Sequence, residues 1–192
     1  MGYSISWCAV REERADQFIQ KLGLTPTGET EQEPESLISS GKLNTGWRVI
    51  WYNEYDCPFL RPEDLANGSV EQDVLVCRVE EHVMASSSEL WSGGQRKWWL
   101  SHEAENDPKE LATVGELPES FAAIRKEMEE LQTAAGGEDA DVDYIFEIPL
   151  TVARTLVGFK HDETCPHLIG GHFEVLSRVA PRSGILARLF GS

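Results

Sequence analysis

The 192-residue sequence has little positive charge and no long hydrophobic run. Seventeen Lys and Arg residues stand against 33 Asp and Glu residues, which gives a formal net charge of -16. A surface of this sign repels the phosphates of nucleic acids, so we expect no nucleic-acid partner. No segment approaches the roughly 18 consecutive apolar residues of a membrane-spanning helix. The stretch MGYSISWCAVREERAD also lacks the basic region and apolar run of a secretory signal. These absences predict a cytoplasmic protein without a membrane partner.

Cysteine is scarce as well. The four cysteines, Cys8, Cys57, Cys77 and Cys165, lie far apart, and Cys8 and Cys77 fall in apolar runs. In a chain of this length such spacing predicts reduced and mostly buried thiols rather than a disulfide framework. This prediction agrees with a cytoplasmic location.

The motifs of several enzyme classes are missing from the sequence. It contains no G-x-x-x-x-G-K-[ST] loop, no G-x-G-x-x-G, no H-E-x-x-H and no C-x-x-C. P-loop hydrolases, Rossmann dehydrogenases, zincins and thioredoxin-like oxidoreductases therefore have no motif support. An enzyme with a different site geometry stays open.

What the sequence does contain is apolar periodicity that predicts strands and helices. Residues 3–10 have apolar side chains at every second position, which is typical of a strand, and residues 11–22 have them at helical spacing. Residues 25–46 are polar and rich in turn formers, so we expect a long surface loop. Residues 47–54 have apolar groups on both faces, which predicts a central strand, and residues 61–68 predict a short helix.

The middle of the chain predicts a tryptophan-rich hairpin. Residues 73–103 form two strands around a Gly93–Gly94 turn, so that Trp91 faces Arg96 as a cation–π pair. Counting outward from this turn, the predicted register places on one face Val83, Ala85, Trp91, Trp98, Leu100 and His102. It places on the other face His82, Met84, Ser86, Ser88, Trp99 and Glu103.

The second half of the chain completes the predicted architecture. Its expected elements are strands at 111–114, 142–149 and 173–179 and helices at 117–137, 150–159 and 184–190. We expect one α+β domain over residues 1–160, built on a largely antiparallel sheet with the Trp-rich hairpin at its centre and helices on one face. Residues 161–192 are expected to form a C-terminal extension with a loop, a strand and a short amphipathic helix.

The densest run of reactive side chains is FKHDETCPHLIGGHFEVL. His161, Cys165, His167 and His172 are all of the types that bind zinc, and four such groups would complete a tetrahedron. Their irregular gaps fall in one loop, whereas zinc motifs place paired ligands in two separate knuckles. A solvated connection is therefore the favoured interpretation, with no cofactor, and a zinc site is the alternative. A Cys165–His167 nucleophile pair is disfavoured because side chains two positions apart on an extended segment point the same way but need not touch.

A second cluster of histidine and glutamate lies at the open end of the predicted hairpin. Glu80 and His82 share a strand face, and the predicted pairing brings Glu103 within reach of His82. A carboxylate beside an imidazole orients a general base, so one hypothesis is a small hydrolase-like enzyme. A solvent-facing polar surface is the favoured interpretation. His102 falls on the tryptophan-rich face, where a structural hydrogen bond is the more common role.

Aromatic residues and charge together favour a binding function. Trp91, Trp98 and Trp99, with Tyr52 and Tyr55 nearby, predict an aromatic patch on an acidic rim, which is typical of a protein-binding surface. Cover of these rings by a helix of the same chain is the favoured interpretation of the patch itself. The leading hypothesis is an acidic protein-binding module, inhibitor-like, immunity-like or regulatory, with a basic protein partner. Homo-oligomerisation through the C-terminal helix is also open.

Overall fold

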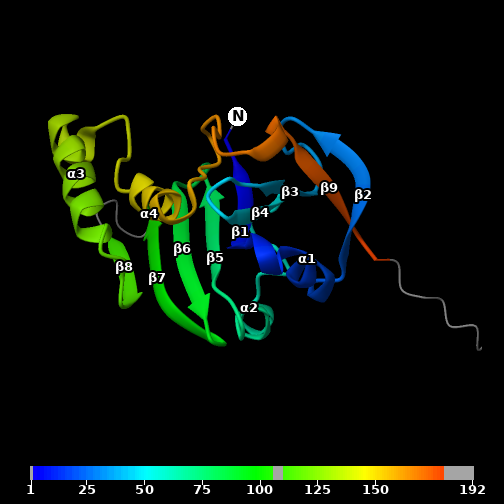
Figure 1. Ribbon diagram of the computed structural model, residues 1–192. Coiled ribbons are helices and arrows are strands. Elements are labelled where there is room, and N and C mark those ends of the chain that lie inside the picture. Colours follow the sequence, from blue (N-terminus) through cyan, green and yellow to red (C-terminus); the bar gives the residue numbers. More distant parts are fainter. Residues whose placement is uncertain (1, 106–109, 180–192) are drawn as a thin grey trace, which may run out of the picture.

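A nine-stranded antiparallel sheet forms the centre of the computed structural model, which describes residues 2–105 and 110–179 (Figure 1). The strands are β1 (Ser4–Arg11), β2 (Leu24–Glu31), β3 (Ile38–Lys42), β4 (Trp47–Tyr52), β5 (Val74–Glu80), β6 (Ala85–Ser92), β7 (Gln95–Glu103), β8 (Leu111–Gly115) and β9 (Phe173–Arg178). Their order across the sheet is β2-β9-β3-β4-β1-β5-β6-β7-β8. Within the described residues, four α-helices accompany the sheet: α1 (Glu12–Lys21), α2 (Pro62–Gly68), α3 (Phe121–Ala134) and α4 (Glu147–Val157). The predicted α+β fold class is confirmed.

The helices lie on both faces of the sheet, so the prediction of helices on one face is wrong. The central strands are apolar on both sides: in β1, Trp7 belongs to one hydrophobic core and its neighbour Cys8 belongs to the other. Helices α3 and α4 cover the Trp7 face, whereas α1 and α2 cover the Cys8 face (Figure 1). A sheet with two apolar faces requires helices on both sides, because each large apolar side chain that becomes fully buried stabilises the fold by roughly 1.5–3 kcal/mol.

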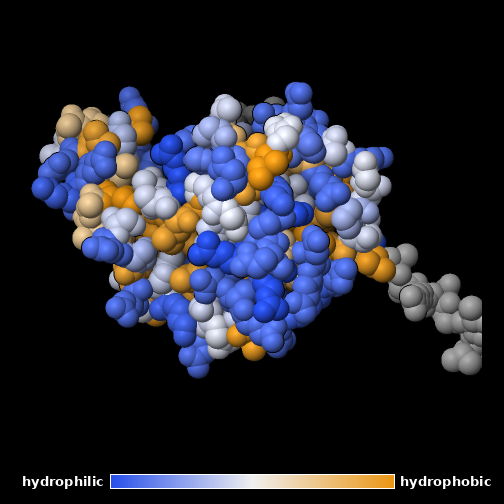
Figure 2. Space-filling view, in the orientation of Figure 1, coloured by the Kyte–Doolittle hydropathy of each residue, from blue (hydrophilic) through white to orange (hydrophobic). Residues whose placement is uncertain are grey.

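The outer surface is mostly polar. Figure 2 shows a largely hydrophilic face with apolar patches around α3 and α4, where Leu131 and Leu156 are exposed. None of the helices among the described residues is long and apolar enough to cross a membrane.

The segment predicted as a loop at 25–46 contains two strands. β2 is the outermost strand at one edge of the sheet, and its side chains from Thr25 to Thr30 are exposed. Pro26 and a register shift between Pro26 and Thr30 interrupt its pairing with β9. Proline, bulges and polar side chains are typical of edge strands, and they remove the apolar alternation that marks a strand in sequence.

The C-terminal segment belongs to the sheet. β9 pairs with β2 on one side and with β3 on the other, so the predicted strand at 173–179 forms. The expected boundary at residue 160 is therefore corrected: residues 161–178 connect to and complete the sheet of residues 1–160 rather than extend from it. The amphipathic helix expected at 184–190 lies outside the described residues.

The strand expected at 142–149 does not form, because this segment leads into α4. The side chain of Asp143 accepts hydrogen bonds from the backbone N–H groups of Ile145 (2.9 Å) and Phe146 (3.0 Å) and turns the chain there. Pro149 then lies in the first turn of α4, where proline is well tolerated. The predicted helices at 11–22, 61–68 and 117–137 correspond to α1, α2 and α3.

The predicted hairpin forms as β6 and β7, with β5 as a third strand beside β6. It lies next to the edge strand β8 rather than at the centre of the sheet, where β1 lies. Trp91 faces Arg96 as predicted, and the guanidinium carbon lies 6.0 Å from the ring centroid. Beyond this pair a β-bulge shifts the register by one residue, so that Leu90 rather than Glu89 pairs with Trp98. Because a one-residue shift reverses the faces, Trp91 and Trp98 pack in different cores rather than side by side.

Candidate functional site

The four zinc-ligand candidates are not brought together. Their nearest polar partners are Glu81 Oε1 for His161 Nε2 (3.3 Å), Gly158 O for Cys165 Sγ (3.7 Å), Asn44 Oδ1 for His167 Nδ1 (2.9 Å) and Gly170 O for His172 Nδ1 (2.9 Å). Within residues 2–105 and 110–179, no group of three or more His, Cys, Asp or Glu side chains is placed to hold a metal ion. The alternative of a zinc site is therefore corrected, because each candidate ligand has a different polar partner and the described residues hold no group placed to bind a metal ion.

The candidate general base at His82 lies on open surface. The His82 side chain is 62% exposed, and its Nδ1 lies 2.7 Å from Glu80 Oε1. A hydrogen bond from the Ser4 hydroxyl, followed by those from His82, lowers the pKa of Glu80. The shifted register pairs Glu103 with Ala85 instead of Met84, so β6 separates Glu103 from Glu80. The three groups thus do not form the expected cluster, and the geometry is that of an exposed ion pair.

His102 is fully buried and joins three segments of the chain. Its Nδ1 lies 2.8 Å from the carbonyl oxygen of Glu110, and its Nε2 lies 2.8 Å from Asp143 Oδ2. Both partners are acceptors, so both ring nitrogens donate and the ring is an imidazolium paired with a carboxylate. Burial favours a higher pKa for Asp143, but the hydrogen bonds from His102, Phe146 and Ile145 outweigh burial and lower it. His102 therefore links β7, the start of β8 and the turn before α4.

The predicted aromatic surface is corrected for three of its five residues. Tyr52, Trp91 and Trp98 are buried, at 2%, 8% and 3% exposure, and cannot contact a partner. Tyr52 stacks on Phe59, with ring centroids 6.0 Å apart, and Trp98 packs in the core that α3 and α4 cover. The favoured interpretation, cover by the same chain, holds for these three rings. Trp99 and Tyr55 stay half-buried.

Trp99 lies in a shallow hollow on the open face of β7 and β8. This hollow, called the Trp99 hollow below, has a volume of about 170 Å³ and is lined by Trp99, Ser101, Glu103, Glu110 and Ala112. Ser101 pairs with Ala112 across the two strands, and Glu110 directly precedes β8. β8 is the outermost strand of the sheet at this edge, and Val114 on it is 51% exposed. An indole ring and two carboxylates thus share one accessible depression.

A charge cluster built on the buried carboxylate of Glu89 lies beside Trp99. Glu89 lies opposite Trp99 in the β6–β7 pairing, and its side chain is 5% exposed. Its carboxylate accepts from Arg78 Nη1 at 2.8 Å and lies 3.5 Å from Arg96 Nη1. The Arg96 guanidinium carbon lies 5.9 Å from the Trp99 ring centroid. One side of the indole therefore already interacts with a cation that the protein supplies.

A second hollow adjoins His161. This His161 hollow has a volume of about 230 Å³, and its walls come from the segment after β2, from β4 and from the loop after α4. It is lined by Gln32, Glu33, Pro34, Trp51, Phe159, His161, Glu163, Thr164, Cys165, Leu168, Gly171 and Phe173. A larger surface depression of about 410 Å³ lies on the other side of the same loop and shares Glu163, Thr164 and Cys165 with it.

Sequence reasoning found His161 and Cys165 but missed the residues around them. Glu81, the partner of His161, lies in the turn between β5 and β6, eighty positions earlier. Trp51 is buried at 2% exposure, and the pairing of β4 with β3 and the packing of the loop after α4 place it at the wall of the hollow. No spacing pattern in the sequence connects these segments.

Comparisons of this chain with protein-family models, with curated proteins and with solved structures gave no match.

Proposed function

We propose that this protein binds a basic protein partner and that the Trp99 hollow receives a Lys or Arg side chain of that partner. The observation that carries the proposal is the half-buried indole of Trp99 beside Glu103 and Glu110 in one depression. Aromatic faces attract cations, and carboxylates form charge-assisted hydrogen bonds with ammonium and guanidinium groups. A basic side chain is the partner group that uses both.

The overall charge supports the same partner. A formal net charge of -16 attracts a basic protein over distances longer than any contact, which speeds encounter and makes it sensitive to salt. The charge alone would select any basic protein. The Trp99 hollow adds a local recognition element, because only a partner with a protruding basic side chain fills it.

The edge of the sheet supplies a second contact surface. β8 reads Leu-Ala-Thr-Val-Gly and carries neither charge nor proline, whereas β2 at the opposite edge carries Pro26, a register shift and exposed polar side chains. Edge strands without such protection pair readily with another strand. An extended segment of the partner that lies along β8 would therefore reach the Trp99 hollow.

Titration calorimetry with a panel of purified basic proteins tests the proposal. We expect binding by at least one member at low salt, with clear weakening at about 0.15 M salt. Trp99→Ala should weaken this binding by about tenfold, the size of a partly desolvated cation–π contact. Absence of binding by every member at low salt would refute the proposed function.

A charge-matched pair of variants separates the Trp99 hollow from general charge. The double variant Glu103→Gln/Glu110→Gln and the control Glu63→Gln/Asp64→Asn on α2 each remove two negative charges. We expect the first to weaken binding at least fivefold more than the second, because the α2 carboxylates lie outside the Trp99 hollow. Equal weakening by the two double variants would refute a role for the Trp99 hollow.

A further inference from the structure

β8 is an edge strand with a neighbour on one side. It is the last strand of the sheet, and within residues 2–105 and 110–179 it pairs only with β7. Thr113, Val114 and Gly115 on it are exposed. In an edge strand, every second residue directs its backbone N–H and C=O groups away from the sheet, where they can bond a further strand. β8 therefore offers a row of backbone donors and acceptors to an extended segment.

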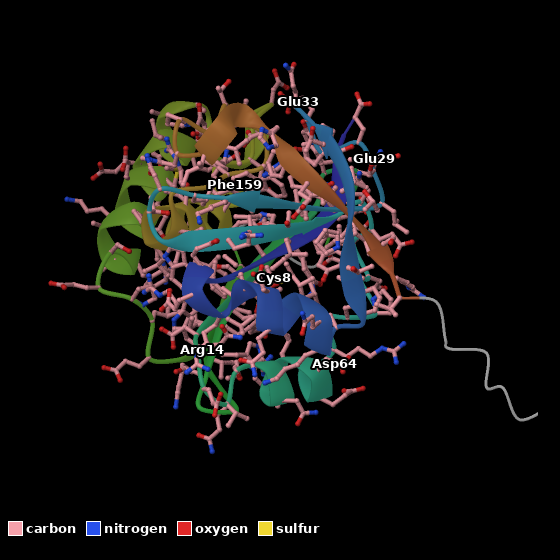
Figure 3. All side chains as sticks on the ribbon, turned by 45° about the vertical axis from the view of Figure 1, so that its right-hand side comes forward. Cys8, Arg14, Glu29, Glu33, Asp64 and Phe159 are labelled. Carbon is pink, nitrogen blue, oxygen red and sulfur yellow. The ribbon has the colours of Figure 1, made fainter. Side chains whose placement is uncertain are left out.

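The opposite edge of the sheet is protected against such pairing. On β2, Pro26 has no N–H group, and the pairing with β9 shifts register after it. The exposed carboxylate of Glu29, labelled in Figure 3, lies in this shifted part. Proline, bulges and charged side chains all hinder the addition of a strand. β8 contains no proline or charged residue and pairs with β7 without a register shift, so an added strand has its place at β8.

The side chains of β8 alternate between two different faces. Ala112 pairs with Ser101 and Val114 pairs with Trp99, so these four side chains share the open face on which the Trp99 hollow lies. Leu111 packs against the core on the other face, which α3 and α4 cover. A strand added along β8 has the same alternation. Only every second side chain of that strand therefore lies over the open face.

The Trp99 hollow determines which side chain fits there. Along the strands, the small residues Ser101 and Ala112 lie in its middle, with Trp99 towards one end and Glu103 and Glu110 towards the other. Its volume of about 170 Å³ is below the range of about 300–1,000 Å³ that holds drug-sized ligands, so it suits a single side chain. An added strand lies roughly 9.5 Å from β7, which is two strand spacings and requires a long side chain. Lys and Arg are long and end in a cation, which the indole ring and the carboxylates attract.

We infer that β8 binds an extended segment of the basic partner as an additional antiparallel strand, with a Lys or Arg opposite Ala112 and an apolar residue opposite Val114. This inference rests on the proposed function and names the segment that is recognised: apolar-x-basic-x-basic, with the second basic residue opposite Glu110. Antiparallel pairing continues that of β7 and β8 and is slightly more stable than parallel pairing. The small side chain of Ala112 leaves room for the basic side chain, and Val114, which is 51% exposed, gains an apolar neighbour.

Two peptides of equal composition and charge test the alternation. Thr-Val-Thr-Lys-Thr-Lys-Thr places valine and both lysines on one face, whereas Thr-Val-Thr-Thr-Lys-Lys-Thr places the lysines on opposite faces. Binding to the isotope-labelled protein at low salt is followed through backbone amide chemical shifts and deuterium exchange. We expect the alternating peptide to bind about fivefold more tightly and to slow amide exchange in β8 but not in β2. Equal affinities of the two peptides, or unchanged exchange in β8 at saturation, would overturn the inference.

Backbone methylation tests the strand pairing without any change to the protein. In an extended segment paired along one edge, alternate N–H groups point towards β8 and away from it. Two versions of the alternating peptide carry N-methyl groups on one set or on the other. We expect one version to bind about tenfold more weakly than the parent peptide and the other to bind within about threefold of it. The same affinity for both versions would contradict the addition of a strand.

Matched variants of β8 test the position of the basic side chain. Ala112→Leu fills the middle of the Trp99 hollow and should weaken binding of the alternating peptide about tenfold. Thr113→Leu changes the next residue, whose side chain lies on the other face, and should leave the affinity within about twofold. If the two variants have the same effect, the basic side chain does not lie opposite Ala112 and the inference is overturned.

The outcomes separate this inference from the proposed function. If a basic protein binds in a Trp99-dependent manner but the alternating peptide does not bind at millimolar concentration, the inference is overturned and the proposed function stands. If no basic protein binds either, both are overturned. A homodimer whose β8 amides are protected before any peptide is added would also overturn the inference, because a second copy of the chain then occupies this edge.

Discussion

Removal of the His102 imidazole tests how β7 is linked to the start of β8 and to the turn before α4. His102→Ala removes a donor from the Glu110 carbonyl and a charged donor from Asp143, both at 2.8 Å. Removing one partner of a buried ion pair costs about 3–5 kcal/mol. The Asp143 side chain is 17% exposed and keeps the N–H donors of Ile145 and Phe146, so we expect the lower end of this range. The free energy of unfolding should fall by about 3 kcal/mol.

The assay is urea unfolding followed by tryptophan fluorescence, with linear extrapolation to water. Asp143→Ala and the double variant complete a cycle, in which we expect a coupling free energy of about 2 kcal/mol between the two side chains. His172→Ala is the control, since this exposed ring bonds only the nearby Gly170 carbonyl, and its effect should stay within about 0.5 kcal/mol. A cost below about 1 kcal/mol for His102→Ala, or strictly additive single variants, would contradict the buried imidazolium–carboxylate pair.

Acid titration gives a second view of this pair. The pKa of Asp143 is lowered in the folded protein from its ordinary value of 3.8, because hydrogen bonds outweigh burial. Its contribution to the free energy of unfolding is therefore present in full above its unfolded pKa and is lost as the pH falls through the lower folded pKa. Below about pH 4, wild type should lose stability more steeply than Asp143→Ala.

Two further predictions concern the Gly115 backbone at the end of β8 and the Glu12 side chain at the start of α1. Gly115 has φ +83°, and a Cβ there would lie 2.1 Å from the Lys97 carbonyl oxygen, so Gly115→Ala should lower the free energy of unfolding by more than about 3 kcal/mol in thermal or urea unfolding. The control is Gly23→Ala, at φ +69° with nothing within 4 Å of the added Cβ, which should lower it by only about 1 kcal/mol. Equal losses in the two variants would argue against the close approach of β7 and β8. Glu12 accepts from Arg48 at 2.7 Å and 2.8 Å, which lowers the pKa of its carboxyl, so Glu12→Gln should lower the free energy of unfolding by about 1–2 kcal/mol at pH 7. The difference in free energy of unfolding between wild type and Glu12→Gln should shrink as the pH falls below about 4.5 towards the lower folded pKa, because the wild-type carboxylate is then also neutral. A difference that does not change with pH would contradict the role of the Glu12 charge.

The predictions of secondary structure succeeded where one pattern dominated a segment. β1, α1 and α3 each repeat apolar side chains at one period, whereas apolar side chains on both faces made β4 identifiable as a central strand. β2 was missed because an edge strand needs no apolar alternation. The segment before α4 was misassigned because its apolar run fits either structure, although Pro149 at the first turn of α4 was a usable signal.

The sites depended on features that local patterns do not encode. A single extra residue in β7 changes the cross-strand partner of Trp98 from the predicted Glu89 to Leu90. Every β7 residue beyond the bulge therefore lies on the opposite face from the one predicted. The contact of His161 with Glu81 spans eighty positions and depends on the order of strands in the sheet. The types of residue that form the hollows were recognisable in the sequence, but their neighbours were not.

The place of β9 between β2 and β3 has a consequence for the order in which the chain is made. Among the described strands, β2 pairs only with β9, so Thr25 cannot pair until Ser177 has been synthesised. A nascent chain therefore emerges from the ribosome with Leu24–Glu31 unpaired and the outer side of β3 open until residues 173–178 are synthesised. A premature stop codon before that point would leave β2 without a partner strand and β3 paired only with β4. The truncated product would then expose unpaired backbone N–H and C=O groups to chaperones and proteases.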